Sequence, residues 1–177
     1  MKPTYSLRIS ILVILMAICS NFFGQVTNSQ PSGKNLAIVA TPSSSVRYGS
    51  PLNSLNDELT PANTGGMRTG GNRPPQRLTS QWIQYEWIRP VTTSGIAVYW
   101  WNYGNTQKLP YAYRIKYWDG NDFVAVRNAS GYGLQNNEYN RTTFDPVQTT
   151  KLRLEVDSAD RLPGTILEWM VFQTENS

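Results

Sequence analysis

The sequence predicts an all-β fold, a sandwich or barrel of about eight or nine short antiparallel strands. The main observation is that apolar and polar residues alternate with a period of two in several short segments, which places one set of side chains on each face of a strand. A second is that β-branched and aromatic residues dominate these segments, and residues 81–126 hold five of the six tryptophans. A third is that turn-forming residues separate the segments at near-regular spacing, and no segment forms a convincing helix.

The central block, residues 81–126, is expected to form four of these strands. Each of the first three carries an alternating set of large side chains on one face, and the fourth covers residues 123–126. These sets are Ile83, Tyr85 and Trp87, then Ile96, Val98 and Trp100, then Tyr113, Ile115 and Tyr117. After the third strand, Asp119-Gly120-Asn121 indicates a hairpin turn, because glycine adopts a positive φ at little cost.

Further strands are expected on both sides of this block. They cover residues 35–41, 46–48, 141–144, 151–156 and 165–173. Two segments without periodicity, residues 49–75 and 128–139, are expected to be loops, and loops of this length in a compact domain commonly carry function. The glycines of residues 49–75 do not form a phosphate-binding loop, since no strand leads into them and no Gly-Lys-Ser/Thr follows.

The N-terminal segment, residues 1–24, is interpreted as a secretory signal peptide that is cleaved after Gly24. Lys2 and Arg8 flank an apolar run that is too short to span a bilayer as a helix. The competing interpretation is a lipoprotein signal, in which Cys19 carries the lipid, but Ile18 is bulky where such signals prefer a small residue. Either interpretation predicts a bacterial protein that is secreted, periplasmic or at the cell surface.

The rest of the chain is expected to form one domain. Residues 25–34 are polar and contain Pro, Gly and Ser, which is typical of a short linker, and residues 35–175 follow as a single unit. The one cysteine lies in the signal segment, so this domain contains no disulfide. A monomer is expected.

Composition excludes several classes of function. The chain has no histidine, which removes the Ser-His-Asp arrangement and the commonest zinc ligand. The formal net charge is only +4, and Lys2 and Arg8 leave with the signal segment, so nucleic-acid binding is not expected. A pair of carboxylates can suffice for glycoside hydrolysis, but the acidic residues lie in predicted turns and on outer strand faces without a recognisable motif. The sequence therefore does not predict an enzyme.

Four short motifs carry a resemblance to a known family. They are Asn35-Leu36-Ala37, Leu55-Asn56-Asp57-Glu58, Trp82-Ile83-Gln84-Tyr85-Glu86 and Leu167-Glu168-Trp169-Met170-Val171-Phe172, joined by Val98-Tyr99-Trp100 and Tyr117-Trp118-Asp119-Gly120. In this order they resemble the discoidin family, also called the coagulation factor five/eight type C domain, of the galactose-binding-like superfamily. The resemblance covers residues 35–173 and is greatest to the version appended to bacterial glycoside hydrolases such as β-L-arabinofuranosidases.

The resemblance implies an eight-stranded jelly-roll β-sandwich, a structural calcium ion near one end, and a ligand bound by loops at one rim. Across the family the ligands are galactose-type sugars, other glycans, phospholipid or protein, and fold alone does not choose among them. For calcium, which prefers hard oxygen ligands, the resemblance implies the carboxylates of Asp57 and Glu168. It also implies the carbonyls of Leu55, Ala62 and Leu167. The alternative is an Asx turn at Asn56-Asp57, with Glu168 paired to an arginine.

The residues themselves suggest where a sugar would bind. A saccharide needs an aromatic surface for its C–H face and a few polar groups for its hydroxyls. Trp100 and Trp101 are adjacent and point to opposite faces of a strand, so if Trp100 is in the core, Trp101 is not, and its ring is a candidate platform at the rim. The candidate ligand-binding residues are Trp101, Asn102 and Tyr103, with Arg68 or Arg73 and Tyr132 converging on them. The alternative is that Trp101 packs under its own loop on Pro110 and Tyr111.

The predicted function is a secreted, non-catalytic carbohydrate-binding module that holds a glycan or polysaccharide through its rim loops. Two alternatives stay open: an adhesion module for a protein or membrane surface, and an accessory domain that docks on a separate glycoside hydrolase. An exposed apolar patch on a sheet face would favour the docking alternative. Membrane contact is not expected beyond the lipid anchor that Cys19 would carry.

Overall fold

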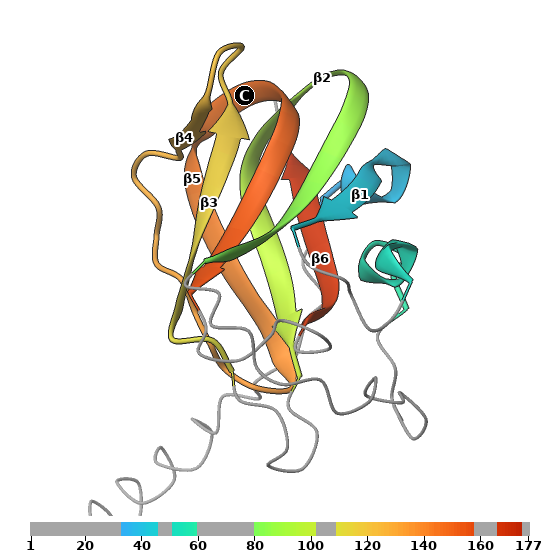
Figure 1. Cartoon of the computed structure of the whole chain (residues 1–177), viewed down its shortest axis with the longest axis vertical. Helices are drawn as coiled ribbons and strands as arrows, with labels where there is room; N and C mark the ends of the chain where they lie inside the picture. The colour runs from blue at the N-terminus through green and yellow to red at the C-terminus, as the bar shows by residue number, and fades with distance from the viewer. Residues whose placement is uncertain (1–32, 46–50, 60–79, 102–108, 158–165, 175–177) are drawn as a thin grey trace, which may run out of the picture.

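Six β-strands and two 3-10 turns form the described part of the chain, residues 33–45, 51–59, 80–101, 109–157 and 166–174 of a computed structural model (Figure 1). The strands are β1 (Thr41–Ser44), β2 (Gln81–Trp100), β3 (Ala112–Trp118), β4 (Phe123–Ala125), β5 (Glu138–Asp157) and β6 (Ile166–Gln173). The turns are η1 (Ala37–Val39) and η2 (Leu52–Leu55). No helical element in these ranges is long and apolar enough to cross a membrane.

Two long, bent strands build both layers of the sandwich. The first half of β2 pairs with β1 and with the second half of β5, which pairs with β3, and β3 pairs with β4. The second half of β2 pairs with the first half of β5 and with β6. Every pairing is antiparallel, so a five-stranded layer faces a three-stranded one. This is the antiparallel β-sandwich of about eight strand segments that the sequence predicts.

The prediction of separate short strands was wrong in one respect, because β2 and β5 are continuous. The predicted strands around Tyr85 and Val98 are the two halves of β2, and residues 141–144 and 151–156 both belong to β5. Register shifts between Glu86 and Val91, and between Thr93 and Gly95, bend β2 between the layers without ending it. Irregularities of this kind interrupt the alternation in sequence and bend a strand in space.

The predicted strand at residues 35–41 was also wrong. Asn35 makes only an isolated bridge to Phe172, and the chain then turns through η1 before β1 begins. The Asn35 side-chain oxygen accepts hydrogen bonds from the peptide N–H groups of Ala37 (3.0 Å) and Val171 (3.1 Å). This local side-chain bond competes with strand pairing and favours a turn. The predicted strand at residues 46–48 lies outside the described residues.

The hairpin predicted at Asp119-Gly120-Asn121 is confirmed. Trp118 on β3 pairs with Phe123 on β4, and Gly120 has a φ of 109°. The Asp119 carboxylate accepts hydrogen bonds from the peptide N–H groups of Asn121 and Asp122, both at 2.8 Å. These backbone donors, that of Asp122 first, lower the pKa of Asp119.

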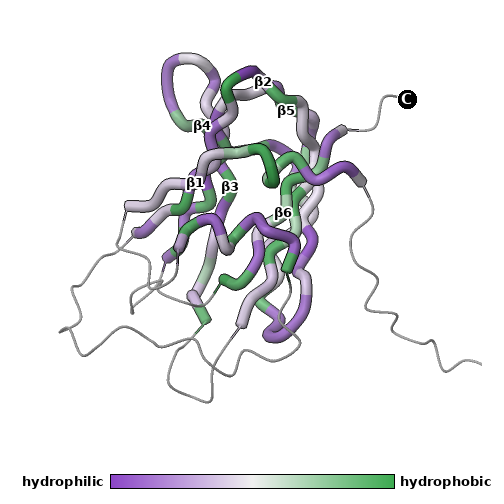
Figure 2. Tube along the Cα trace, turned by 90° about the vertical axis from the view of Figure 1, so that its right-hand side faces the viewer, coloured by the Kyte–Doolittle hydropathy of each residue, from purple (hydrophilic) through white to green (hydrophobic). Residues whose placement is uncertain are grey.

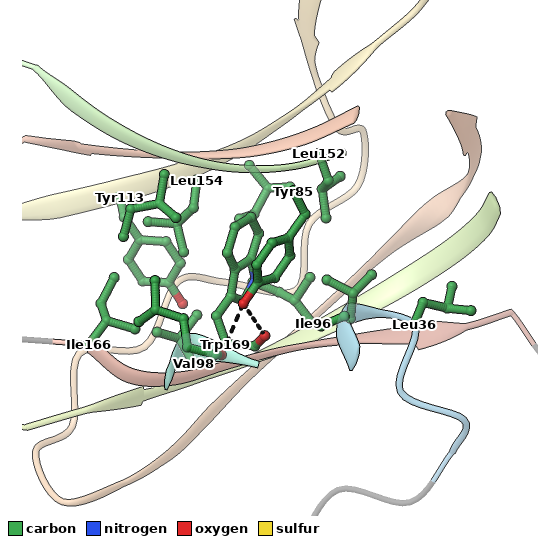
Figure 3. Close-up of a cluster of buried hydrophobic side chains, with 14 of the residues drawn as sticks. Leu36, Tyr85, Ile96, Val98, Tyr113, Leu152, Leu154, Ile166 and Trp169 are labelled. Atoms are coloured by element: carbon green, nitrogen blue, oxygen red, sulfur yellow. Dashed lines mark hydrogen bonds between the residues drawn. The ribbon is translucent and has the colours of Figure 1, made fainter. Parts of the chain in front are cut away.

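The core lies between the two layers, where large side chains from both meet (Figure 3). Tyr85 of the five-stranded layer stacks on Trp169 of the three-stranded layer, with ring centroids 4.2 Å apart. Its hydroxyl donates to the carbonyls of both Leu55 (2.9 Å) and Trp169 (3.0 Å). Figure 2 shows hydrophobic and hydrophilic residues interleaved along the strands, as the period-two pattern requires. The buried aromatic pair thus joins both layers and the η2 segment.

Candidate functional site

One end of the sandwich gathers the first and last residues of the two long strands, β2 and β5. Because β2 and β5 each fold back on themselves, both their first and last residues lie at this end (Figure 1). Trp100 at the end of β2 pairs with Glu138 at the start of β5, and Ala112 at the start of β3 pairs with Asp157 at the end of β5. We call this the loop end; it is the rim where the sequence predicts ligand binding.

A run of aromatic rings supports the loop end from inside. Trp100 is fully buried, and its ring lies 5.2 Å from that of Tyr113, which lies 5.0 Å from that of Tyr132. The next residue, Trp101, is only half-buried. The predicted division between a core Trp100 and a more accessible Trp101 is therefore confirmed. Of the two residues in the alternative packing of Trp101, Tyr111, which precedes β3 at the same end, is 76% exposed, and Pro110 is buried.

The loop that carries Tyr132 is held by side chains of β5 and β2. Thr142 donates to the Gly131 carbonyl (2.7 Å), and the Trp100 indole N–H donates to the Gly133 carbonyl (3.2 Å). The Asn140 amide accepts from the Gln135 N–H (2.7 Å) and donates to the Gln135 carbonyl (2.8 Å). Tyr132 thus lies between two anchored glycines and turns its half-buried ring toward Tyr113.

Of the predicted ligand-binding residues, the described part of the chain includes Trp101 and Tyr132. The others, Asn102, Tyr103, Arg68 and Arg73, lie outside it. The exposed Tyr111 is an additional rim aromatic. Its position directly after Pro110, before the alternation of β3 begins, was the available signal in the sequence.

A second notable group surrounds Glu168, which lies on β6 opposite Tyr99 and is fully buried. Its Oε1 accepts a hydrogen bond from the peptide N–H of Glu58 at 3.4 Å, and no hydrogen-bond donor among the described residues reaches its Oε2. Burial, with the negative charge of Asp57 as the next cause, raises the pKa of Glu168 from 4.5 to about 8. A buried carboxyl beside other carboxylates is costly to ionise unless a cation joins it.

The loop that faces Glu168 is tied to the N-terminal turn by asparagines. Asn56 donates to the Ala37 carbonyl at 2.6 Å, and Asn35 donates to the Glu58 carboxylate at 3.1 Å. Asp57 accepts from the Leu59 N–H at 3.0 Å, which is an Asx turn. Asn35, Asn56 and Glu58 thus position this group; in the sequence, Asn35 and Glu58 stand out only as parts of the motifs that carry the resemblance.

The residues present fit a calcium ion in part. The described residues contain no group of three acidic, histidine or cysteine side chains in a metal-binding arrangement, but calcium accepts backbone carbonyls in place of further carboxylates. The partnerless Oε2 of Glu168 beside Asp57 is what an oxygen-liganded cation would satisfy. The Leu55 carbonyl already accepts a hydrogen bond from Tyr85 and keeps a second lone pair. Leu167 adjoins Glu168 on β6, and Ala62 is outside the described residues.

The alternative to a metal was an Asx turn together with an arginine partner for Glu168. The Asx turn is present at Asp57. Within the described ranges, the ion pairs of the arginines involve Glu155 and Asp157, not Glu168. The buried carboxyl is therefore not neutralised by a described arginine.

Several solved structures share this fold. A chain of the Streptococcus pneumoniae β-galactosidase BgaA superposes with a TM-score of 0.63 at 17% identity, covering 81% of this chain and 100% of that one. The module CpGH89CBM32-6 of Clostridium perfringens gives 0.53 at 15% identity, over 80% of this chain and 100% of that one. CpGH89CBM32-5 of the same organism, in complex with GalNAc-β-1,3-galactose, gives 0.52 at 16% identity, over 78% and 99%.

At these identities the likeness concerns the fold. The chain shares the β-sandwich fold of these structures, which agrees with the fold that the resemblance in its sequence implies. No protein-family model matches the chain, and no curated protein matches it in sequence.

Proposed function

We propose that this chain is an exported, non-catalytic carbohydrate-binding module that holds a glycan at the loop end of the sandwich. The observation that carries the proposal is the pair Trp101 and Tyr111. Trp101 is half-buried and Tyr111 is 76% exposed, and both lie at the end where the buried rings of Trp100 and Tyr113 form a rigid support. Partly exposed aromatic rings on a rigid base are suited to stacking against the C–H face of a sugar.

The likeness in fold directs the choice of ligand. One similar structure is a module bound to GalNAc-β-1,3-galactose, and another, at a TM-score of 0.51, is a chitosan-binding module of a Paenibacillus chitosanase/glucanase. Galactose-containing glycans and amino-sugar polymers are therefore the first ligands to test. A shallow site of this kind binds weakly, since it buries little area and must desolvate polar groups.

A calcium ion bound by Asp57 and Glu168 completes the proposal, with backbone carbonyls of Leu55, Ala62 and Leu167 as further ligands. The cation supplies the positive charge that the buried Glu168 lacks, and it holds the η2 loop against β6. The partnerless Oε2 of Glu168 supports this assignment. The role is structural, because the cation would join the loop to the strand.

Export is part of the same proposal. Residues 1–24 have the composition of a signal peptide, with Cys19 as the position a lipid would occupy if the segment is a lipoprotein signal. A glycan-binding module acts where polymeric glycans are found, outside the cytoplasm.

Among the described residues, the most exposed aliphatic side chains do not favour the docking alternative. Ile38 and Val39 belong to the η1 turn, and Ile88 lies in the bend of β2, so they do not form a patch on a sheet face. The glycan-binding function is therefore the one that the described residues favour.

A glycan array with and without chelator tests the proposal. We expect selective binding by the protein and its loss in Trp101→Ala and Tyr111→Ala. Ile88→Ala, which removes an exposed side chain at the opposite end, is the control and keeps the binding. Binding that survives both aromatic variants would place the ligand elsewhere, and a folded protein that binds no glycan would contradict the proposed function.

A further inference from the structure

The outer face of the five-stranded layer carries three aromatic side chains where solvent-facing positions normally hold polar residues. Trp82 is on β2, Trp118 ends β3 and Phe123 begins β4, and all three are half-buried. Their sequence neighbours Ile83 and Tyr117 point the other way, toward the core. The three rings therefore lie on strands, on the face of the layer opposite the core.

Arg153 of β5 lies between two of these rings. The carbon at the centre of its guanidinium is 4.4 Å from the centroid of the Trp82 ring and 3.6 Å from that of Phe123. The ring of Trp118 lies 5.3 Å from that of Phe123 and extends the aromatic surface toward β3. Contact with two rings restricts the guanidinium, which otherwise moves at the end of a long and flexible side chain.

Among the described residues, only one edge of the Arg153 guanidinium, formed by Nε and Nη2, makes hydrogen bonds. Its Nε (3.2 Å) and Nη2 (2.8 Å) both donate to the side-chain oxygen of Gln84, the residue paired with Arg153 across the sheet. Its Nη1 has no hydrogen bond among the described residues. The remaining edge, formed by Nη1 and the second N–H of Nη2, can bind a carboxylate with two parallel hydrogen bonds.

The charges on this face leave Arg153 without a carboxylate. The ion pairs are Arg114 with Glu155 (2.8 Å) and Asp157 (2.8 Å), Lys116 with Glu155 (3.1 Å), and Lys151 with Glu86 (3.3 Å). Among the described residues, the carboxylates of Glu86, Glu155 and Asp157 are therefore paired with other cations, whereas Arg153 has only the neutral amide of Gln84. Glu155 and Asp122 act on it through space, but burial outweighs them and lowers the pKa of Arg153. The cation is partly desolvated without full compensation.

We propose that this outer face, formed by Trp82, Arg153, Phe123 and Trp118, is a second binding surface, for a polysaccharide that carries carboxylates on its sugar rings. The carboxylate of one uronic acid residue accepts hydrogen bonds from Nη1 and Nη2 of Arg153. Neighbouring sugars lie against Trp82 on one side and Trp118 on the other. This site is separate from the proposed glycan site at the loop end and does not depend on it.

The shape and chemistry of the face favour an extended acidic polymer over a small anion or a neutral glycan. The rings lie along several adjacent strands, and a sheet face is flat, so it can contact consecutive sugars of one chain. Lys151, 5.8 Å from the Trp118 ring, adds a second cation beside the stack. A neutral glycan would leave the free edge of Arg153 without a charged partner, and a lone anion would make no use of the rings.

The test is titration of the protein with oligogalacturonate, with its methyl ester and with poly-L-glutamate, followed by calorimetry. The methyl ester keeps the sugar chain and removes the charges, whereas poly-L-glutamate keeps carboxylates and removes the sugars. We expect binding of oligogalacturonate alone, weakened by salt. Arg153→Lys keeps the positive charge but loses the pair of parallel N–H donors. It should reduce the affinity for oligogalacturonate roughly ten- to hundredfold, the range expected for hydrogen bonds to a charged group. Trp82→Ala should also reduce it.

Three comparisons keep the outcome interpretable. Ile88→Ala is a surface control and should bind oligogalacturonate as the unaltered protein does. Trp101→Ala separates the two sites, because it should lose neutral glycans and keep oligogalacturonate. Shifts of the Trp82 and Trp118 indole N–H signals in NMR spectra of the unaltered protein give a readout that no variant can disturb by unfolding.

Equal binding of the acid and its methyl ester, or of poly-L-glutamate, would overturn the proposal, as would oligogalacturonate binding that Arg153→Lys leaves unchanged. Absence of oligogalacturonate binding would also overturn it and show that the stacked residues only stiffen the sheet. None of these results bears on the loop end, whose own test uses neutral glycans and Trp101→Ala.

Discussion

The buried carboxyl of Glu168 on β6 accepts a hydrogen bond from the peptide N–H of Glu58, 3.4 Å away and 110 positions earlier in the chain. One backbone donor does not compensate for a carboxyl that is fully buried and faces Asp57. The contact brings a loop and a closing strand together around an unbalanced charge. Its energy therefore depends on whether a proton or a cation neutralises Glu168.

Replacing Glu168 with glutamine should stabilise the metal-free protein at a pH above the raised pKa of about 8. The amide keeps the volume and removes the repulsion from Asp57, so we expect a gain of about 1–2 kcal/mol. The same change should abolish any stabilisation by calcium. Thermal unfolding with calcium and with chelator measures both effects, and Glu86→Gln, an exposed residue, is the control. An undiminished response to calcium in Glu168→Gln would refute the metal site.

The stability of the metal-free protein should fall as pH rises from about 4.5 to about 8. In this interval the folded protein keeps a proton on Glu168 that the unfolded chain has already released, so raising the pH favours unfolding. The loss attributable to this group is on the order of a few kcal/mol. Urea denaturation at a series of pH values measures it, and Glu168→Gln shows how much of the slope belongs to Glu168.

With calcium present, this pH dependence should largely disappear. Binding of the cation requires the ionised carboxylate, so it displaces the proton and becomes tighter as pH rises. Calorimetry in buffers of different ionisation enthalpy would detect the released proton. A metal affinity that does not vary between acidic and neutral pH would show that Glu168 is not a ligand.

Tyr85→Phe should destabilise the protein by about 1–3 kcal/mol, because two buried carbonyls lose their shared donor. The ring stack on Trp169, at 4.2 Å, does not need the hydroxyl and should persist. Since one of those carbonyls belongs to Leu55, the variant should also loosen the η2 loop. Hydrogen exchange at residues 52–55 compared with β5 measures the local effect, and uniform loss of protection would mean that the hydroxyl acts only on global stability.

Gly133→Ala should destabilise the loop that carries Tyr132. A Cβ at this position would lie 2.5 Å from the Asn140 side-chain oxygen and 3.2 Å from its Cβ, and Asn140 is held by its hydrogen bonds to Gln135. We expect a cost of about 1–3 kcal/mol. Gly95→Ala is the matched control, because its Cβ would meet nothing nearer than 3.6 Å. Equal denaturation midpoints for the two variants would contradict the close packing.

The fold class and the side chains of the core could be predicted from alternation because a strand with one buried face repeats every two residues. Ile83, Tyr85 and Trp87 follow this rule, and so do Ile96, Val98 and Trp100. The continuity of β2 could not be predicted, since the residues in its bend break the alternation just as a loop would. The turn at residues 37–39 could not be predicted either. It depends on the Asn35 side chain, which bonds to Ala37 and is held in place by Val171, a residue distant in sequence.

Local sequence therefore indicates most of the strand segments, the hairpin turn at Asp119 and the opposite directions of Trp100 and Trp101, because each depends mainly on neighbouring residues. Only the tertiary structure decides that Glu168 is buried beside Asp57 and Glu58, with no ion pair to an arginine among the described residues. The same is true of the position of Arg153 between Trp82 and Phe123. These relationships arise from the pairing of strands that are remote in sequence. The energy of a charged group is then set by which charges and dipoles that pairing brings within a few ångströms of it.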